Sequence, residues 1–341
     1  MPHLSKHSLR GLSRNAFTRL SILIGGGSGF LGQALASSLR SHGHEVKIIS
    51  RTRDLSFSHS LITWDDIKRD GLPHSTDAVI NLAGSNIMDF KKLWTCSYME
   101  ECVTSRVSTT EIIAKAIAKS ISPPSVWIST SAVGFYPPSK DNEYDEKSVV
   151  DVNKADKDWM SQLCSKIENA AKIPGSQTRT RSVIMRTGIV LGKGGGAYSN
   201  MQLPFYCCLG GTFGDGSQWF PYVHLNDVVR AYEFVMSEPR ARGPINVVAP
   251  SACTNFEFTK ALGEAMWRPT ILPVPSFMSS FMGTERGSIL FDGQHVKPNA
   301  LTSMGFKFHY PDVTSCCQDL ALGDCCSLLP DTSVLSPDSS Q

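Results

Sequence analysis

Short apolar runs alternate with helical patterns over the first half of the chain. The apolar runs predict buried strands over residues 21–24, 45–50, 78–82, 126–129 and 182–186. Between them, apolar residues recur at helical spacing, which predicts helices over residues 30–41, 99–120 and 159–171. Strands that alternate with helices are typical of βαβ units. The pattern therefore predicts an α/β fold of the Rossmann type, a doubly wound parallel sheet with both faces covered.

The pattern changes near Gly188, where glycine, proline and aromatic residues replace the regular periodicity. A helix is predicted over residues 225–237 and a strand over 244–248. The Rossmann domain is expected to span residues 21–188, with 222–248 returning to it. A smaller C-terminal α/β portion is expected over residues 189–221 and 249–315, and residues 319–341 are predicted to form a disordered tail.

The first twenty residues form a basic leader without any acidic residue. It carries Lys6, Arg10, Arg14 and Arg19, and the first acid of the chain is Glu45. Apolar residues fall at near-helical spacing in this leader. A basic, amphipathic and acid-free segment is typical of a mitochondrial transit peptide, so residues 1–20 predict mitochondrial targeting. The alternative is a cytoplasmic protein with an additional N-terminal segment.

Composition excludes several classes of protein. The 341 residues are 41% hydrophobic and carry a formal net charge of +2, which argues against a disordered chain and against a nucleic-acid partner. No apolar run reaches the ~18 residues of a membrane span, so no membrane partner is expected. The ten cysteines form no CxxC pair, which predicts reduced thiols and no metal site.

A glycine-rich turn follows the first predicted strand and opens the first predicted helix. Gly26, Gly29 and Gly32 match GxxGxxG, and Gly27, Gly29 and Gly32 match GxGxxG. Glycine permits a tight turn and a close approach of the backbone to a pyrophosphate, which the helix N-terminus attracts. The motif in this strand–turn–helix context predicts a dinucleotide site. The alternative is a glycine-rich turn without a ligand.

The end of the second predicted strand favours one form of the dinucleotide. An acidic residue there favours NAD, because it accepts hydrogen bonds from the ribose hydroxyl. This chain has Ser50 and Arg51 instead. A hydroxyl and a guanidinium suit a 2′-phosphate, so the sequence predicts NADP(H) as the cofactor. The alternative is a solvated loop arginine.

Several further segments carry a resemblance to a known family. The phosphate loop, Asn81-Leu82-Ala83-Gly84 and Ser129-Thr130-Ser131-Ala132 resemble an extended short-chain dehydrogenase/reductase. RTGIVLGKGGGA (186–197), FPYVHLNDV (220–228) and FDGQHVKPNAL (291–301) are similar to its atypical "epimerase family protein" branch. The resemblance covers residues 21–315.

The resemblance implies a set of cofactor contacts. The phosphate loop would meet the pyrophosphate, Ser50 and Arg51 the 2′-phosphate, and Val190 the nicotinamide. From the residues alone, Glu101 and Arg106 are expected to form a solvated pair on the helix surface. The candidate cofactor residues are Gly26, Gly27, Ser28, Gly29, Phe30, Leu31, Gly32, Ser50, Arg51, Leu82, Ala83, Glu101, Arg106 and Val190.

The usual catalytic pair of the superfamily is missing. Typical members combine a serine with a YxxxK helix, and Ser131 matches the serine. The tyrosine and lysine positions fall at Met160 and Cys164. The only literal YxxxK starts at Tyr136, where two prolines preclude a regular helix. Tyr136 is a candidate for reaching a substrate from a loop, but not for the catalytic base.

His224 and Asp227 are further polar candidates beside the substrate, although Asp227 also suits support of the following helix.

Two functions remain in view. The first is an NADP-dependent oxidoreductase or epimerase-like enzyme that acts on a small hydroxy or carbonyl compound bound by the C-terminal portion, with Ser131 polarising the reacting oxygen. The second is a non-catalytic NADP(H)-binding sensor or regulator. A nucleotide-sugar epimerase that holds NAD is disfavoured by Arg51 and by the missing YxxxK. A homodimer is the expected assembly.

Overall fold

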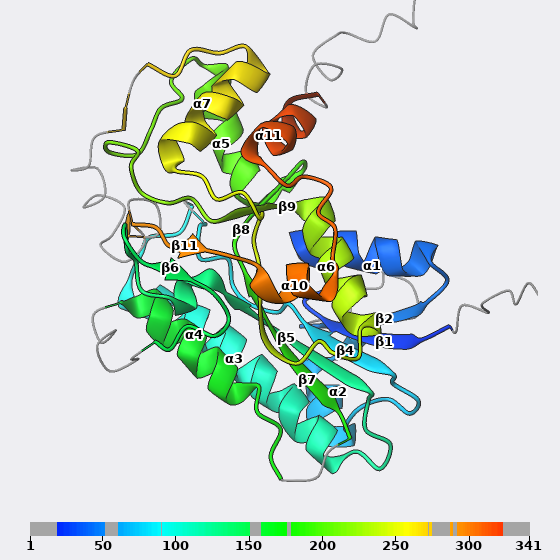
Figure 1. The fold of residues 1–341 in the computed structure, drawn as a ribbon. Helices are drawn as coiled ribbons and strands as arrows, with labels where there is room; N and C mark the ends of the chain where they lie inside the picture. Colours follow the sequence, from blue (N-terminus) through cyan, green and yellow to red (C-terminus); the bar gives the residue numbers. More distant parts are fainter. Residues whose placement is uncertain are drawn as a thin grey trace, which may run out of the picture.

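A seven-stranded parallel sheet forms the centre of the computed structural model, with the strand order β10-β7-β5-β4-β1-β2-β3 (Figure 1). The structure describes residues 19–51, 61–89, 91–150, 158–175, 179–271, 273–274, 287–288 and 292–322. The strands are β1 (Ser21–Gly25), β2 (Glu45–Ser50), β3 (Leu61–Thr63), β4 (Ala78–Asn81), β5 (Val126–Ala132), β7 (Arg181–Thr187) and β10 (Gly243–Val247). This order is that of a Rossmann fold, and the predicted fold class is confirmed.

Helices cover both faces of the sheet. One face packs against α1 (Phe30–Ser41) and α6 (Leu225–Ser237), and α10 (Asn299–Met304) closes this layer beside β10. The other face packs against α2 (Trp64–Asp70), α3 (Cys96–Lys119) and α4 (Trp159–Ala170). Both faces are apolar because the strands alternate side chains between two helical layers. Because the strands of this sheet are parallel, their carboxyl ends meet at one edge, and the loops at this edge can carry a site.

A smaller lobe stands above this edge (Figure 1). It contains α5 (Gly196–Tyr206), α7 (Asn255–Met266) and α11 (Val313–Leu322), joined by the strand pair β8 (Ile189–Gly192) and β9 (Tyr222–His224). Its core includes Tyr198, Phe258 and Leu320, and it is separate from the core of the sheet. The short pair β6 (Glu143–Tyr144) and β11 (His295–Val296) and the 3-10 turn η1 (Val133–Phe135) lie beside the sheet edge.

The boundary predicted for the tail is wrong over residues 319–322. They complete α11, whose Leu320 is fully buried. Asp319 accepts hydrogen bonds from Tyr310 at 3.1 Å and lies 3.3 Å from Lys193 Nζ. The serine- and proline-rich composition further along the chain concealed the helix that precedes it. Residues 323–341 of the predicted tail, and residues 1–18 of the predicted leader, lie outside the described residues.

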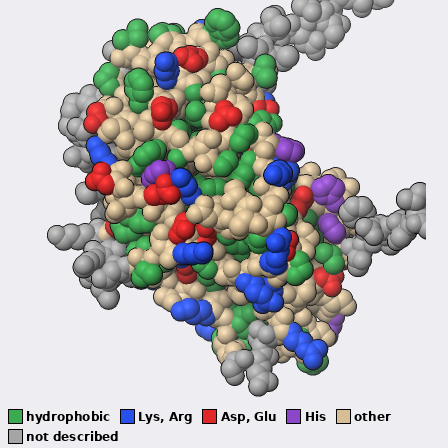
Figure 2. Space-filling view, viewed as in Figure 1, with side chains coloured by type: hydrophobic (Ala, Val, Ile, Leu, Met, Phe, Trp, Pro, Cys, Tyr) green, Lys and Arg blue, Asp and Glu red, His purple; other side chains and the backbone are tan. Residues whose placement is uncertain are grey.

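The surface carries charges of both signs on both lobes, as the face in Figure 2 shows. Among the described residues, no helix is both long enough and apolar enough to cross a membrane.

Candidate functional site

The glycine-rich turn between β1 and α1 is a close-packed backbone cradle. Gly26 has a φ of +75°, and a Cβ there would lie 2.7 Å from the backbone nitrogen of Ala83. A Cβ at Gly32 would lie 2.7 Å from the Cα of Gly27. The first turn of α1 contains no acidic residue, and no side chain caps it. The backbone N–H groups and the positive end of the helix dipole therefore face the sheet edge, where an anionic group is stabilised.

A cleft of about 630 Å³ opens beside this cradle at the carboxyl edge of β1, β2 and β4. The structure brings eight of the fourteen predicted cofactor residues to its walls. They are Gly26, Ser28, Gly29, Ser50, Arg51, Leu82, Ala83 and Glu101. These residues come from the β1–α1 turn, the end of β2, the segment after β4 and helix α3, and only the folded chain places them together.

The cleft also has walls that the sequence patterns did not identify. Trp64 follows β3, and its indole ring packs against Gly25, where a Cβ would lie 3.0 Å from a ring carbon. Lys92 adds a second cation to the side that carries Arg51. Tyr98 donates a hydrogen bond from its hydroxyl to the carbonyl oxygen of Asn86. The sequence pattern did not predict β3, so it gave no signal for Trp64, and Lys92 belongs to no motif that the sequence analysis identified.

Glu101 belongs to this cleft, although its negative charge is unusual beside an anion site. Its carboxylate accepts hydrogen bonds from Ser85 Oγ at 2.8 Å and from Lys92 Nζ at 3.4 Å. The bond from Ser85, together with the nearby charges of Lys92 and Arg51, holds the pKa of Glu101 below its usual value. The carboxylate is therefore ionised at neutral pH and orients both neighbouring donors.

Arg106 lies directly behind the cleft wall. A Cβ at Gly84 would lie 2.8 Å from Arg106 Cγ, so the glycine makes room for this side chain. Arg106 Nη1 donates to the carbonyl oxygen of Cys102 at 3.1 Å, and burial lowers the pKa of the guanidinium. It forms no ion pair with any carboxylate of the described residues. Arg106 and Glu101 thus form no pair with each other, which corrects the expectation of a solvated surface pair.

Phe30 was expected to line the pyrophosphate, but its ring packs elsewhere. A Cβ at Gly195 would lie 2.5 Å from a ring carbon of Phe30, and a Cβ at Gly196 would lie 2.8 Å from another. The ring of Phe30 therefore packs against Gly195 and Gly196, the glycines that follow β8. The side chain links the phosphate turn to the loop that leads into the small lobe.

The other four predicted cofactor residues also lie outside the cleft walls. A Cβ at Gly27 would meet Ile48 at 2.8 Å. Leu31 and Val190 are partly buried against the core of the sheet, and Gly32 is buried in α1.

Met160 and Cys164, the positions expected for the missing catalytic pair, both lie in α4. The side chain of Met160 packs on Gly134, where a Cβ would lie 3.0 Å from the methionine Cε. Cys164 is buried, and burial raises the pKa of its thiol to about 12. A neutral thiol and a thioether do not perform the acid–base chemistry of tyrosine and lysine.

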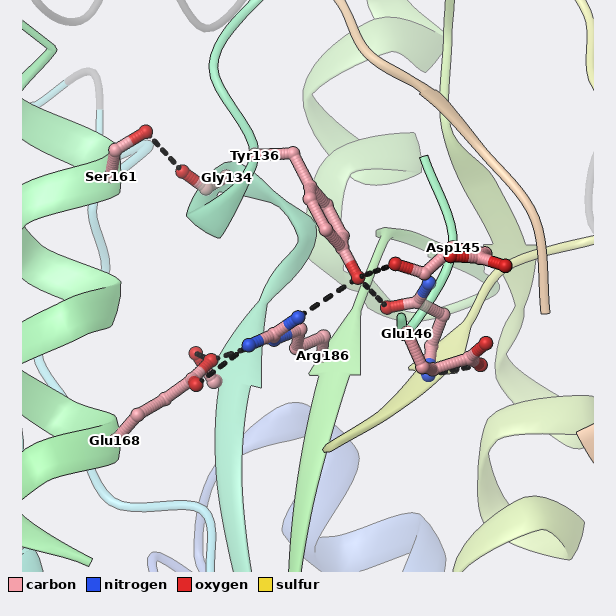
Figure 3. Close-up of polar contacts among 9 residues, drawn as sticks. Gly134, Tyr136, Asp145, Glu146, Ser161, Glu168 and Arg186 are labelled. Carbon is pink, nitrogen blue, oxygen red and sulfur yellow. Dashed lines mark hydrogen bonds and ion pairs between the residues drawn. The ribbon is translucent and has the colours of Figure 1, made fainter. Parts of the chain in front are cut away.

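Ser131 belongs to a buried polar network with Glu168 and Arg186. Figure 3 shows Glu168, Arg186 and Tyr136 of this network. Its Oγ donates to Glu168 Oε1 at 3.1 Å. Arg186 donates to both carboxylate oxygens of Glu168 at 2.8 Å, so the pair is bidentate. The guanidinium also stacks on the Phe135 ring at 3.6 Å and donates to the Tyr136 hydroxyl at 2.9 Å. Hydrogen bonding by Glu168 and the charges of Glu168 and Tyr136 outweigh burial and raise the pKa of Arg186.

The expectation that Tyr136 reaches a substrate from a loop is wrong. Its side chain is 0% exposed and stacks on Tyr144 at 5.0 Å. Its hydroxyl lies 2.9 Å from Asn246 Oδ1 and 2.9 Å from the carbonyl oxygen of Asp145. Burial raises the pKa of this hydroxyl. Tyr136 is a structural link between η1 and β10, because the turn after β5 directs its ring inward.

His224 and Asp227 support the fold. His224 Nδ1 accepts a hydrogen bond from the backbone of Asn226 and caps α6, while its Nε2 lies 3.3 Å from Asp319. Asp227 is fully buried and accepts hydrogen bonds from the backbone N–H groups of His309 and Tyr310. Neither residue lines the cleft.

Comparisons with known proteins agree with this geometry. Residues 22–249 match the NAD dependent epimerase/dehydratase family, and residues 274–320 match a domain of unknown function, DUF1731. The chain is 40% identical over 302 residues to the mouse "Epimerase family protein SDR39U1", a match that covers 88% of this chain and 99% of the mouse protein. It is 34% identical to "Epimerase family protein SH2119" of Staphylococcus haemolyticus, over 87% of this chain and 98% of that protein.

Two solved structures with more than 25% sequence identity to this chain share its fold. The crystal structure of human epimerase family protein SDR39U1 (isoform 2) with NADPH superposes with a TM-score of 0.84 at 38% identity, covering 89% of this chain and 99% of that one. A nucleoside-diphosphate sugar epimerase from Corynebacterium glutamicum gives a TM-score of 0.70 at 26% identity, covering 89% and 59%. From its sequence match and its fold, the chain belongs to the NAD dependent epimerase/dehydratase family.

Proposed function

We propose that this protein binds NADP(H) in the cleft beside the β1–α1 turn and is an oxidoreductase or epimerase-like enzyme for a small hydroxy or carbonyl compound. The observation that carries the proposal is the convergence of the uncapped N-terminus of α1, the close-packed glycines and the Ser50–Arg51 pair on one cleft. The human relative crystallised with NADPH supports the same cofactor.

The residues of the cleft suit the parts of this cofactor. The backbone of Gly26 to Gly29 would hold the pyrophosphate, and Arg51 with Lys92 would meet the 2′-phosphate. Trp64 offers a flat aromatic surface for the adenine. When bound, NADP(H) supplies or accepts the hydride. Ser131 lies at the carboxyl end of β5, in the strand next to β4, and would contact the reacting oxygen of the substrate.

A second function is favoured by one observation. Met160 and Cys164 occupy the positions of the catalytic tyrosine and lysine, which is the expected state of a protein that binds NADP(H) and senses it without turnover. A panel of hydroxy and carbonyl metabolites, followed at the absorbance of the reduced nicotinamide, separates the two functions. Turnover with any compound supports the enzyme, whereas tight NADPH binding without turnover supports the sensor.

The role of Arg51 tests the cofactor assignment. We expect Arg51→Ala to weaken NADPH binding about 10- to 100-fold and NADH binding far less, because a charge-assisted hydrogen bond contributes ~1.5–3 kcal/mol. Affinities are measured by titration of the reduced-nicotinamide fluorescence. Arg242→Ala, an exposed arginine before β10 at the opposite edge of the sheet, is the control and should change neither affinity. Equal losses for NADPH and NADH in Arg51→Ala would refute the assignment.

A further inference from the structure

The hydrogen bond from Ser131 to Glu168 has a defined direction. An ionised carboxylate only accepts hydrogen bonds, and Arg186 favours the ionised form through two charge-assisted bonds. The single hydrogen of the Ser131 hydroxyl is therefore directed to Glu168. Cys164 also makes a side-chain contact with Ser131, and the remaining acceptor capacity of Ser131 Oγ faces any ligand group that contacts it at the sheet edge.

Glu168 also reaches a second, outer pocket. This pocket has a volume of about 330 Å³ and is lined by Phe135, Ser165, Glu168, Asn169, Lys172 and Ser182, among others. It lies at α4 and β7, away from the walls of the cofactor cleft. The side chain of Glu168 is 13% exposed, whereas that of Arg186 is 6% exposed. Glu168 thus connects buried Ser131 to this outer pocket.

We propose that Ser131 and Glu168 form the proton relay of this protein, in place of the missing tyrosine and lysine. The inference rests on the proposed function. When a substrate alcohol is oxidised, its C–H hydride passes to the oxidised nicotinamide of NADP, and a carbonyl forms at the carbon. The O–H proton of the alcohol passes to Ser131 Oγ, while the Ser131 hydrogen passes to Glu168 Oε1. Glu168 then releases this proton to water in the outer pocket, and reduction of a carbonyl is the reverse.

The neighbours of Glu168 suit this role. Arg186 is fully occupied by Glu168, Tyr136 and the Phe135 ring, so its charge and position stay constant while Glu168 changes protonation. The other titratable groups around Glu168 among the described residues are Cys164 and Lys172. The Cys164 thiol is neutral, and Lys172 Nζ donates to Asn169 at 2.8 Å in the outer pocket. Glu168 is a positioning residue, since it acts through Ser131.

The first test needs neither substrate nor cofactor. Carboxyl-carbon NMR of ¹³C-glutamate-labelled protein detects the carboxylate of Glu168, with Glu168→Gln used to assign its signal. Ser131→Ala should shift this signal, because the carboxylate loses the hydrogen bond from the Ser131 hydroxyl. Ser131→Thr keeps the hydroxyl and should restore the wild-type signal, and Lys166→Ala, exposed on α4, should leave it unchanged. An unchanged Glu168 signal in Ser131→Ala would overturn the relay.

The second test uses the alcohol with the highest turnover in the metabolite panel. Glu168→Gln and Ser131→Ala should each lower kcat by about 100-fold or more, with NADP⁺ affinity unchanged. Ser131→Ala preserves the Arg186–Glu168 pair, so it remains informative if Glu168→Gln fails to fold. Unaltered kcat would overturn the relay and leave the proposed cofactor site intact. NADPH binding without turnover of any compound would also overturn it, whereas loss of NADPH binding by the wild type would defeat the proposed function itself.

Discussion

Cys164 shows how strongly a single environment sets the chemistry of a side chain. It occupies the position at which the superfamily carries its catalytic lysine, in contact range of Ser131. A thiol there has a nucleophilic form only when ionised. Burial raises its pKa to about 12, so the thiol is neutral at neutral pH. Cys164 is therefore a small apolar packing residue at neutral pH.

This environment predicts the reactivity of the thiols. With iodoacetamide at pH 8, Cys164 should remain unmodified in the folded protein, while the exposed Cys96, Cys207 and Cys208 react. Peptide mass spectrometry measures the extent of modification at each site. Unfolded protein is the control, in which Cys164 should react as fast as the others. Modification of Cys164 in the folded protein at the rate of Cys207 would contradict its assignment as a neutral buried thiol.

At the scale of one element, the glycines of the β1–α1 turn serve two purposes: close packing of α1 and space for a ligand. Gly32 must let α1 pack against the turn, since a Cβ there would overlap the backbone of Gly26 and lie 2.7 Å from Gly27 Cα. Gly29 has no such restriction, because the nearest atom to a Cβ there is 3.4 Å away. Gly29 nevertheless lines the cleft, so its lack of a side chain matters to a ligand rather than to the fold.

Matched alanine variants separate these two purposes. Gly32→Ala should lower the melting temperature and NADPH affinity together, because the backbone of the turn has to move. Gly29→Ala should leave the melting temperature close to that of the wild type but weaken NADPH binding about tenfold or more, since its methyl group would occupy the place of the pyrophosphate. Thermal unfolding and fluorescence titration provide the two measurements. Unchanged NADPH affinity in Gly29→Ala would show that no pyrophosphate approaches this residue.

Two other elements show where local patterns mislead. Tyr136 and Lys140 have the spacing of a catalytic pair, but the chain there forms the turn η1 and then an extended segment, which buries Tyr136. The sequence pattern also did not predict the helix α11, which begins at Val313 and ends at Leu322. In both cases, the conformation depends on what the segment packs against: η1 on β7 and α4, and α11 on α7.

At the scale of the whole molecule, two lobes meet above the carboxyl edge of the sheet. Phe30 packs against the glycines after β8 and so joins the phosphate turn to the β8–α5 loop. The Lys193–Asp319 ion pair joins this loop to α11. The sequence predicts a division of the chain near Gly188, because the glycine-rich segment after β7 interrupts the regular periodicity.

The basic leader is a property of the whole chain and leads to a cellular prediction. We propose that residues 1–20 direct the protein to mitochondria, because the segment combines arginines, apolar residues at helical spacing and no acid. A fusion of residues 1–25 to a fluorescent reporter should accumulate in mitochondria. The same fusion with Arg10→Glu and Arg14→Glu should stay in the cytosol. A diffuse cytosolic signal from the unaltered fusion would reject mitochondrial import.

The amino-acid sequence by itself determined the parallel sheet, the glycine turn before α1 and the placement of Ser50 and Arg51 at the end of β2. These features depend on local spacing and on apolar periodicity, which can be recognised directly in the amino-acid sequence. Only the tertiary structure decided that Ser131, Glu168 and Arg186 form one network, and that Tyr136 is buried beside it. These residues come from β5, α4, β7 and the turn after β5, and contacts between separate elements depend on how the layers pack rather than on any spacing along the chain.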